Sequence, residues 1–396
     1  MKHLAIINFV WFLILFFYIN LTYAQETAFF VKPAETYHAY TALQDSHFVA
    51  VDQTANSLNK LLFYMGGTTS TTKNTKLFLK LAANLGYHAV SVAYPNATSA
   101  QSACGYSTDT ECFEKFRQEA CFGTPLCDSI DIDTLNSLNT RTLKLIQYLD
   151  SLYPAQGWGQ FLNENNIAWE KVVTSGHSQG SGHALYFLKV RNIDRCIMFS
   201  GANDYSYLYG RPANWISGDF ITSLSKAYCF LHLQDEVGFS KQYDIMNALG
   251  LVNNNDDSTL IDHLSPPYKH SNFLYTGETP ASMLLTAYHN STVVDFWTPK
   301  TYSGNPVFEP VWEYLLTTSH TTRLSKKNTE DNLVIYPNPT SGIIYLNNNE
   351  HPIYVYSISG RLLKRTWNKK KLNITEFPDG MYLISNGKTE IKVIKQ

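Results

Sequence analysis

The chain has 396 residues, more than one hydrophobic core usually holds, so two folded units are expected. Its hydrophobic share of 44% and charged share of 16% are ordinary for a globular protein. The formal net charge of −2 gives no reason to expect nucleic acid or an anionic membrane surface as a partner. The composition therefore indicates a globular protein with more than one domain and argues against a basic nucleic-acid binder.

Residues 1–24 have the pattern of a secretory signal peptide. Lys2 supplies a positive end, residues 4–19 are an almost continuous apolar run, and Ala24 is a small residue just before a cleavage site. The run is short for a membrane span, although an uncleaved N-terminal anchor shares the broad pattern. We therefore expect an exported protein with no stable membrane span and a fold that begins at residue 25.

Strand and helix patterns alternate from about residue 28 to residue 318. The expected strands are 60–67, 88–94, 172–174, 195–200, 228–233 and 272–276, and the expected helices are 73–85, 135–152, 182–190 and 311–316. Residues 95–133 read as a long irregular stretch without a clear period. The alternation predicts an α/β domain over residues 25–318, with a mainly parallel sheet and helices on both faces.

Four of the six cysteines lie within this irregular stretch. They are Cys104, Cys112, Cys121 and Cys127. In an exported chain they indicate disulfides, and a zinc site fits less well because no histidine lies among them. Of the three connectivities, we expect neighbour pairing, Cys104–Cys112 and Cys121–Cys127. The other two, Cys196 and Cys229, fall in expected strands and should be buried thiols.

Residues 176–180 read Gly-His-Ser-Gln-Gly, between a short apolar strand and a helical pattern. This is the Gly-x-Ser-x-Gly pattern in the strand–turn–helix context in which it carries a nucleophile. A serine there sits on a sharp turn with its hydroxyl above the sheet, and the glycines allow that turn without a Cβ clash. A merely Gly/Ser-rich loop is the alternative. The flanking strand and helix favour Ser178 as a nucleophile.

With this motif and its strand-end residues, roughly residues 28–318 resemble the α/β-hydrolase family. In that fold the acid follows the strand one or two after the motif strand, and the histidine follows the last strand. The resemblance implies a serine hydrolase that cleaves ester or related acyl bonds and requires no metal or cofactor.

The resemblance directs attention to two strand ends. Asp235 follows the expected strand 228–233, where it would accept the ring N–H of the histidine; Asp204 is the second candidate, and Glu236 is expected to point elsewhere. His289 follows the last strand and is the best placed of the 12 histidines. The alternatives are a helix cap for Asp235 and a structural role for His289.

An oxyanion hole for such a serine needs two backbone N–H groups. One is expected from Gln179, which follows the nucleophile, and the other from Gly66 or Gly67 in the loop after the first parallel strand. Members of the family often have a His-Gly pair at this loop, whereas Met65 precedes the glycines here. The donor in this loop therefore stays open, and the two glycines could serve only as a turn.

The residue pattern of the sequence changes after a polar linker at residues 319–331. Residues 332–396 carry short alternating strands at 334–336, 353–358 and 380–384, separated by Pro, Asn and Gly turn signals. This pattern predicts a small all-β, sandwich-like domain.

Three motifs in this C-terminal segment, at residues 332–342, 355–361 and 377–382, resemble the type IX secretion sorting domain of Gram-negative bacteria. The resemblance implies the type IX secretion machinery as a partner. It also implies removal of the domain and an enzyme that is secreted or attached to the cell surface. A carbohydrate-binding β-sandwich is the alternative.

Together these patterns predict an exported serine hydrolase that acts on a small-molecule or polymeric ester through Ser178, His289 and Asp235 and an acyl-enzyme. A catalytically inactive surface-binding protein and an acyltransferase with the same triad are the alternatives. Residues 95–133 and 203–220 are expected to shape the pocket, with the aromatic side chains of the second segment mainly packing the fold.

Overall fold

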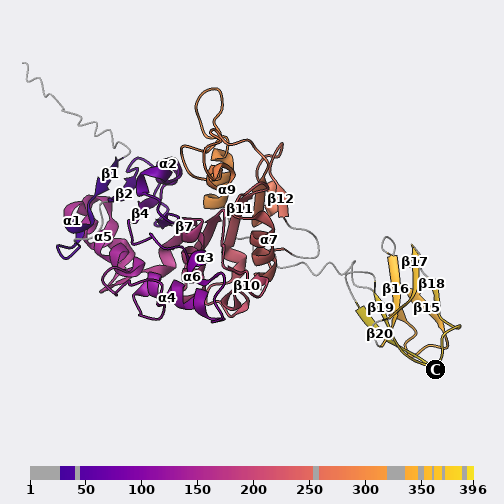
Figure 1. Cartoon of the computed structure of the whole chain (residues 1–396). Helices are drawn as coiled ribbons and strands as arrows, with labels where there is room; N and C mark the ends of the chain where they lie inside the picture. Colours follow the sequence, from indigo (N-terminus) through magenta and orange to yellow (C-terminus); the bar gives the residue numbers. More distant parts are fainter. Residues whose placement is uncertain are drawn as a thin grey trace, which may run out of the picture. The chain divides into compact units, whose positions relative to one another are not determined.

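The computed structural model describes residues 27–40, 45–252, 258–318, 335–346, 352–358, 361–367, 371–385 and 390–396. These residues form a large unit that ends at Thr317 and a small C-terminal unit after it (Figure 1). The expected signal peptide, residues 1–24, and the expected linker, residues 319–331, lie outside the described residues.

The large unit is built on a nine-stranded sheet with the order β1-β2-β4-β3-β7-β8-β11-β13-β12. Its strands are β1 (Thr27–Val31), β2 (His47–Val51), β3 (Leu61–Met65), β4 (His88–Ser91), β7 (Val172–His177), β8 (Arg195–Phe199), β11 (Ala227–His232), β12 (Ser258–Leu260) and β13 (Phe273–Thr276). The β1–β2 and β2–β4 pairs are antiparallel, and the other neighbours are parallel. The mainly parallel sheet is confirmed, while its antiparallel edge and β12 were not predicted.

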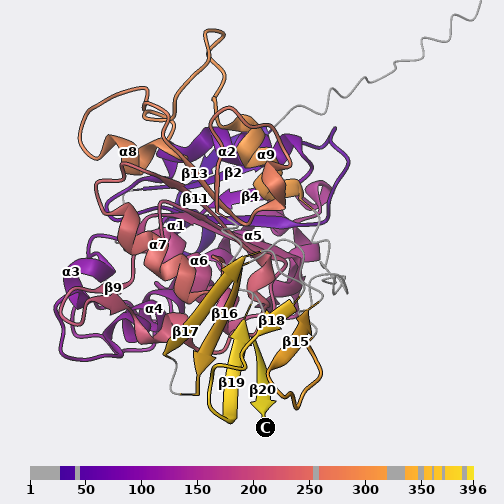
Figure 2. The same cartoon turned by 90° about the vertical axis from the view of Figure 1, so that its right-hand side faces the viewer.

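Helices cover both faces of this sheet, as expected. They are α1 (Pro33–Thr36), α2 (Lys76–Asn84), α3 (Ala100–Cys104), α4 (Cys112–Phe122), α5 (Leu138–Leu152), α6 (Gln179–Val190), α7 (Phe239–Ala248), α8 (Ala287–Ser291) and α9 (Glu309–Thr317). Figure 2 shows α2 and α9 on one side of the sheet and α5, α6 and α7 on the other.

Side chains that alternate along the strands make the two cores. Phe78 of α2 packs against Phe199 of β8 and Trp312 of α9, with ring centroids 5.0 and 5.9 Å apart. On the opposite face Phe63 of β3 packs against Phe187 of α6 at 5.6 Å. A parallel sheet buried on both faces explains why its strands are apolar runs rather than alternating ones.

Residues 95–133 are only partly irregular, which corrects the prediction from sequence. They contain α3 and α4, and α4 buries Phe113, Phe116, Arg117 and Ala120, which recur at helical spacing. The buried Arg117 in this row hides the apolar periodicity, because a charged residue reads as surface until its partner is known.

Two short strand pairs complete the large unit. They are β5 (Leu162–Asn163) with β6 (Asn166–Ile167) and β9 (Tyr205–Ser206) with β10 (Arg211–Pro212). Cys196 of β8 and Cys229 of β11 are fully buried, as predicted, and burial raises the pKa of both thiols.

The small unit has two antiparallel sheets that share one core. One sheet contains β14 (Ile335–Tyr336), β15 (Ile343–Leu346) and β18 (Lys371–Asn373), and the other contains β16 (Pro352–Ser357), β17 (Leu362–Trp367), β19 (Gly380–Ser385) and β20 (Glu390–Lys395). Ile344 and Leu372 of the first sheet pack with Val355 and Ile384 of the second. The predicted all-β unit is confirmed.

Candidate active site

Ser178 lies at the turn between β7 and α6, at the carboxyl end of a central strand. Its backbone has φ 55° and ψ −117°, a conformation that residues with a Cβ rarely adopt. The Ser178 N–H donates to Phe199 O at 2.9 Å, and the Ser178 carbonyl accepts the Ser181 N–H at 3.1 Å. Strain held in place by neighbouring structure is typical of functional positions.

The glycines of the motif are required by close backbone approach. A Cβ on Gly180 would overlap the Met65 carbonyl oxygen, and a Cβ on Gly176 would overlap the backbone of Gly180. A Cβ on Gly67 would lie 3.1 Å from the Ser178 Cβ. The end of β3, the turn and the start of α6 therefore pack backbone against backbone.

Asp235 and His289, 54 residues apart, are in direct contact. His289 Nδ1 lies 2.9 and 2.8 Å from the two carboxylate oxygens of Asp235, and both side chains are buried. Burial acts to raise the pKa of Asp235. The hydrogen bonds from His289, Gln242 and the Val237 N–H outweigh it and hold that pKa below its usual value. Asp235 is therefore an ionised acceptor that orients the imidazole ring.

Asp204, the second candidate acid, is engaged elsewhere. Its carboxylate pairs with the buried guanidinium of Arg117, with Nε 3.1 Å from Oδ2, and it also accepts the Trp215 ring N–H at 2.9 Å. Arg117 Nη1 in turn donates to the Gln179 carbonyl at 2.9 Å. Asp204 thus belongs to a buried ion pair beneath the first turn of α6.

Two residues that the sequence did not assign to the site hold the backbone of His289. Glu236, expected to point elsewhere, accepts the Tyr288 and His289 N–H groups at 3.1 and 2.8 Å. His177 Nε2 donates to the His289 carbonyl at 3.0 Å, and the two rings lie 4.9 Å apart. Burial and the neighbouring His289 lower the pKa of His177 to about 3, so His177 is neutral.

The sequence contained only weak signals for these two contacts. An acidic pair in a loop and a histidine inside the serine motif are both common. Their partners, Tyr288 and His289, lie 52 and 112 residues away, respectively.

Ser178 lies near His289 because its chain neighbour, His177, donates a hydrogen bond to the His289 carbonyl. No hydrogen bond joins the Ser178 hydroxyl to His289 within the described residues. Such bonds are often long before substrate binds and shorten in the complex.

The loop after β3 lies against the serine. The carbonyls of Gly66 and Gly67 accept hydrogen bonds from Tyr94 OH at 2.6 Å and Asn96 Nδ2 at 2.9 Å. The side chain of Gln179 accepts Thr68 Oγ1 at 3.1 Å and thereby ties this loop to the first residue of α6. Because the first N–H groups of a helix lack partners in the helix, the Gln179 N–H suits a developing negative charge.

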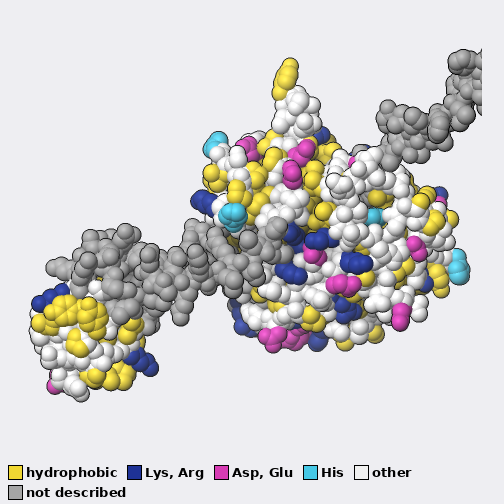
Figure 3. Space-filling model, turned by 180° about the vertical axis from the view of Figure 1, so that it is seen from behind, with side chains coloured by type: hydrophobic (Ala, Val, Ile, Leu, Met, Phe, Trp, Pro, Cys, Tyr) yellow, Lys and Arg dark blue, Asp and Glu magenta, His cyan; other side chains and the backbone are white. Residues whose placement is uncertain are grey.

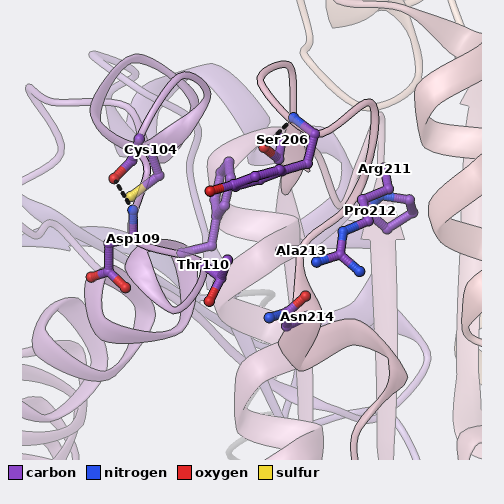
Figure 4. A pocket seen from close by; sticks show the side chains of 11 residues that line it. Cys104, Asp109, Thr110, Ser206, Arg211, Pro212, Ala213 and Asn214 are labelled. Atoms are coloured by element: carbon purple, nitrogen blue, oxygen red, sulfur yellow. Dashed lines mark hydrogen bonds between the residues drawn. The ribbon is translucent and has the colours of Figure 1, made fainter.

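The segments expected to shape the pocket pack on each other beside α6. The Cys104–Cys112 disulfide is formed, as predicted, and Tyr209 OH donates to Thr108 O at 3.0 Å. Figure 4 shows the hollow between them, lined by Asp109, Arg211 and others. Its volume of about 10 Å³ has room for about one water molecule, so this hollow is no substrate site. Trp215 is buried there, as packing predicts.

The second expected disulfide, Cys121–Cys127, is wrong. Cys121 lies on the buried side of α4, with its sulfur 3.8 Å from His183 Nδ1, and Cys127 is also a free cysteine. The helix ends at Gly123 in a left-handed conformation, and the Glu119 carboxylate holds the Cys127 N–H at 2.8 Å. Cys121 is thus committed to the interface with α6, which sequence spacing does not reveal.

Charges on the surface of the large unit are mixed. Figure 3 shows Lys and Arg interspersed with Asp and Glu over the face in view, with no broad field of one sign. Among the described residues, none of the helices combines the length and apolarity needed to cross a membrane.

Comparison with known proteins identifies the C-terminal segment. Residues 334–396 match the family described as "Secretion system C-terminal sorting domain". The type IX sorting domain expected from the sequence is therefore confirmed, and it marks a secreted or cell-surface protein that uses the type IX machinery. No curated protein matches the chain.

Proposed function

We propose that the large unit has the α/β-hydrolase fold and is a serine hydrolase of ester or related acyl bonds. The strand order supports this proposal, because the candidate nucleophile follows the central β7, the acid follows β11 and the histidine follows β13. All three therefore come from carboxyl ends of parallel strands, where active sites of such sheets gather.

The observation that carries the proposal is the Asp235–His289 contact beside a strained serine. Both oxygens of the buried Asp235 carboxylate lie within hydrogen-bond distance of His289 Nδ1. This contact favours the tautomer with the proton on Nδ1, in which Nε2 is free to accept a proton. Ion pairs of this kind also occur in structural roles, but here the pair lies next to the turn that carries Ser178.

The reaction then follows from these groups. Ser178 Oγ attacks the acyl carbon while His289 Nε2 takes the hydroxyl proton, and Asp235 stabilises the imidazolium. The N–H of Gln179 and an N–H of the Gly66–Gly67 loop stabilise the oxyanion. His289 returns the proton to the leaving alcohol, which leaves an acyl-enzyme. Water, deprotonated by His289, then attacks the acyl carbon, and Ser178 regains its proton.

Glu236 and His177 act as positioning residues in this proposal. Glu236 binds the His289 backbone N–H, His177 binds its carbonyl, and Asp235 binds its ring, so three separate groups fix one histidine. A neutral His177 adds no charge next to the imidazolium that forms during the reaction.

The test uses 4-nitrophenyl acetate and a fluorophosphonate probe that labels activated serines. We expect hydrolysis and labelling at Ser178, both lost in Ser178→Ala, whereas Ser129→Ala at an exposed serine retains both. A folded protein that shows neither would favour the surface-binding alternative and overturn the proposal. Ester formation with an added alcohol in preference to hydrolysis would identify an acyltransferase.

A further inference from the structure

A cavity of about 220 Å³ opens beside the candidate site, at the carboxyl ends of β3 and β4. Its lining comes from the segment before β2, the loop after β3, the end of β4 and the segment after β4. The lining residues are Asp45, Gly66, Thr69, Ser70, Thr71, Thr72, Ser91, Val92, Ala93, Tyr94 and Asn96.

One wall of this cavity is the loop that approaches Ser178. Gly66 lines the cavity, and the next residue, Gly67, lies against the Ser178 Cβ. The cavity and the candidate nucleophile are therefore both neighbours of the Gly66–Gly67 segment.

The hydrogen-bond donors of the cavity wall bind backbone carbonyls of the protein itself. Asn96 Nδ2 donates to both Gly67 O and Ser70 O at 2.9 Å. Ser70 Oγ donates to Gly67 O, and Tyr94 OH donates to Gly66 O, at 2.9 and 2.6 Å. A hydroxyl or amide that has donated its hydrogen still offers lone pairs. The wall therefore presents mainly acceptors to an occupant.

Two further groups of the lining can bind a hydroxyl: a carboxylate that accepts, and a serine hydroxyl that donates or accepts. Asp45 accepts the Thr72 N–H at 2.9 Å, which fixes a carboxylate at the wall of the cavity. Ser91 is 1% exposed, and its Oγ has no partner within the described residues. A buried hydroxyl without a partner is costly unless a ligand or water satisfies it.

We propose that this cavity binds a hydroxyl-rich part of the ester substrate, so that the enzyme acts on esters of a sugar or a sugar acid. Such a group brings the O–H donors that the acceptors of the wall require, and its carbon ring can lie against the apolar part of the lining. This inference rests on the serine hydrolase function proposed above. The hydroxyl-rich part enters on either the alcohol or the acyl side of the ester.

The experiment compares four small esters by titration of the acid released. Ethyl acetate carries no hydroxyl groups, hexose monoacetate carries them on the alcohol, methyl hexuronate carries them on the acyl group, and choline acetate carries a cation. We expect kcat/KM for one of the two sugar esters to exceed that for ethyl acetate by at least about tenfold, in line with one or two charge-assisted hydrogen bonds.

Two substitutions in the lining test whether the preference for sugar esters depends on the cavity. Asp45→Asn keeps an acceptor for the Thr72 N–H but removes the charge, and it should reduce the ratio of sugar ester to ethyl acetate about tenfold. Thr71→Val, at an exposed hydroxyl of the lining, should reduce the same ratio less. The matched control, Asp131→Asn at an exposed site outside the lining, should not change it.

The outcomes separate the two proposals. Serine-dependent hydrolysis of ethyl acetate without a preference for either sugar ester would overturn the cavity assignment and leave the hydrolase intact. A preference for choline acetate, or a sugar preference unchanged in both cavity variants, would also overturn it. Absence of any hydrolysis and of fluorophosphonate labelling would overturn the hydrolase proposal and this inference with it.

Discussion

The turn at Ser178 and the short helix α8, which carries His289, meet at the candidate site but are held by different contacts. The turn at Ser178 is fixed by backbone contacts, with β3, β7 and α6 so close that no Cβ fits at Gly176 or Gly180. Helix α8 is fixed by side chains, chiefly the carboxylates of Asp235 and Glu236.

Because of this difference, the two halves of the site should respond differently to substitutions and to pH. A backbone-packed turn is sensitive to added volume and less sensitive to pH, because backbone groups make most of its contacts. A helix held by carboxylates is sensitive to the loss of a single charge and to protonation. The following experiments compare the two modes.

The largest effect is expected at the acid. Asp235→Asn should reduce kcat/KM for 4-nitrophenyl acetate by about 10⁴-fold, because an amide does not hold the productive tautomer of His289. Asp204→Asn should reduce activity less, since Asp204 pairs with Arg117 rather than with the histidine. Steady-state kinetics of the two variants, with circular dichroism as the folding control, checks this. A more severe loss in Asp204→Asn would reverse the assignment.

The serine turn should respond to one added methyl group. Gly180→Ala places a Cβ on the Met65 carbonyl, so the turn must shift, and we expect a loss of about 10²-fold in kcat/KM with about 1–3 kcal/mol of destabilisation. Gly210→Ala is a control for the loss of a glycine, because its Cβ meets nothing within 4 Å, although its positive φ adds some strain. Equal activity in Gly180→Ala and wild type would show that backbone packing does not hold the turn.

Removal of the second carboxylate should have a smaller effect. Glu236→Gln leaves one oxygen for two backbone N–H groups, so we expect kcat to fall about tenfold, equivalent to about 1.4 kcal/mol. A kcat equal to that of wild type, measured by steady-state kinetics, would show that Glu236 does not position the histidine.

Asp295, which follows α8, should make the stability of the large unit depend on pH. Asp295 accepts the Lys76 and Leu77 N–H groups at the start of α2, and burial raises the pKa of its carboxyl from 3.8 to about 6. The native state thus binds more protons than the unfolded state between about pH 4 and 6, so its stability should fall as pH rises through this window. We expect a change of about 1 kcal/mol after allowance for solvent screening.

Urea unfolding at pH 4 and pH 6 measures this change. In Asp295→Asn the pH-dependent part should be absent, because an amide does not titrate in this range. A stability difference of the same size in the variant would assign it to other groups.

Removal of the sorting domain should leave both halves of the site unchanged. The large and small units have separate hydrophobic cores, so a chain that ends at residue 325 should retain full ester hydrolysis in vitro. It should also fail to leave the native cell, because it lacks the segment that matches the sorting domain. Wild-type levels of the shortened protein in the medium would contradict this role of the tail, and loss of activity would show that the units depend on each other.

The sequence by itself determined the features that depend on neighbouring residues. The alternation of apolar strands and helices predicted the mainly parallel sheet, and the Gly-x-Ser-x-Gly motif placed Ser178 at the end of a strand. The order of the strand ends also predicted Asp235 and His289 as site residues, and the structure brings these two residues into contact. Neighbour spacing predicted the Cys104–Cys112 disulfide, which closes a short loop.

Only the tertiary structure decided which distant groups become partners. Arg117 is buried because Asp204 and Gln179 receive its donors, and Cys121 stays free because α4 directs it toward His183. Local sequence sets backbone propensity and the order of strand ends. The pairing of a buried polar group instead depends on which elements the whole core brings within about 3 Å, and this distance is fixed only when all layers pack together.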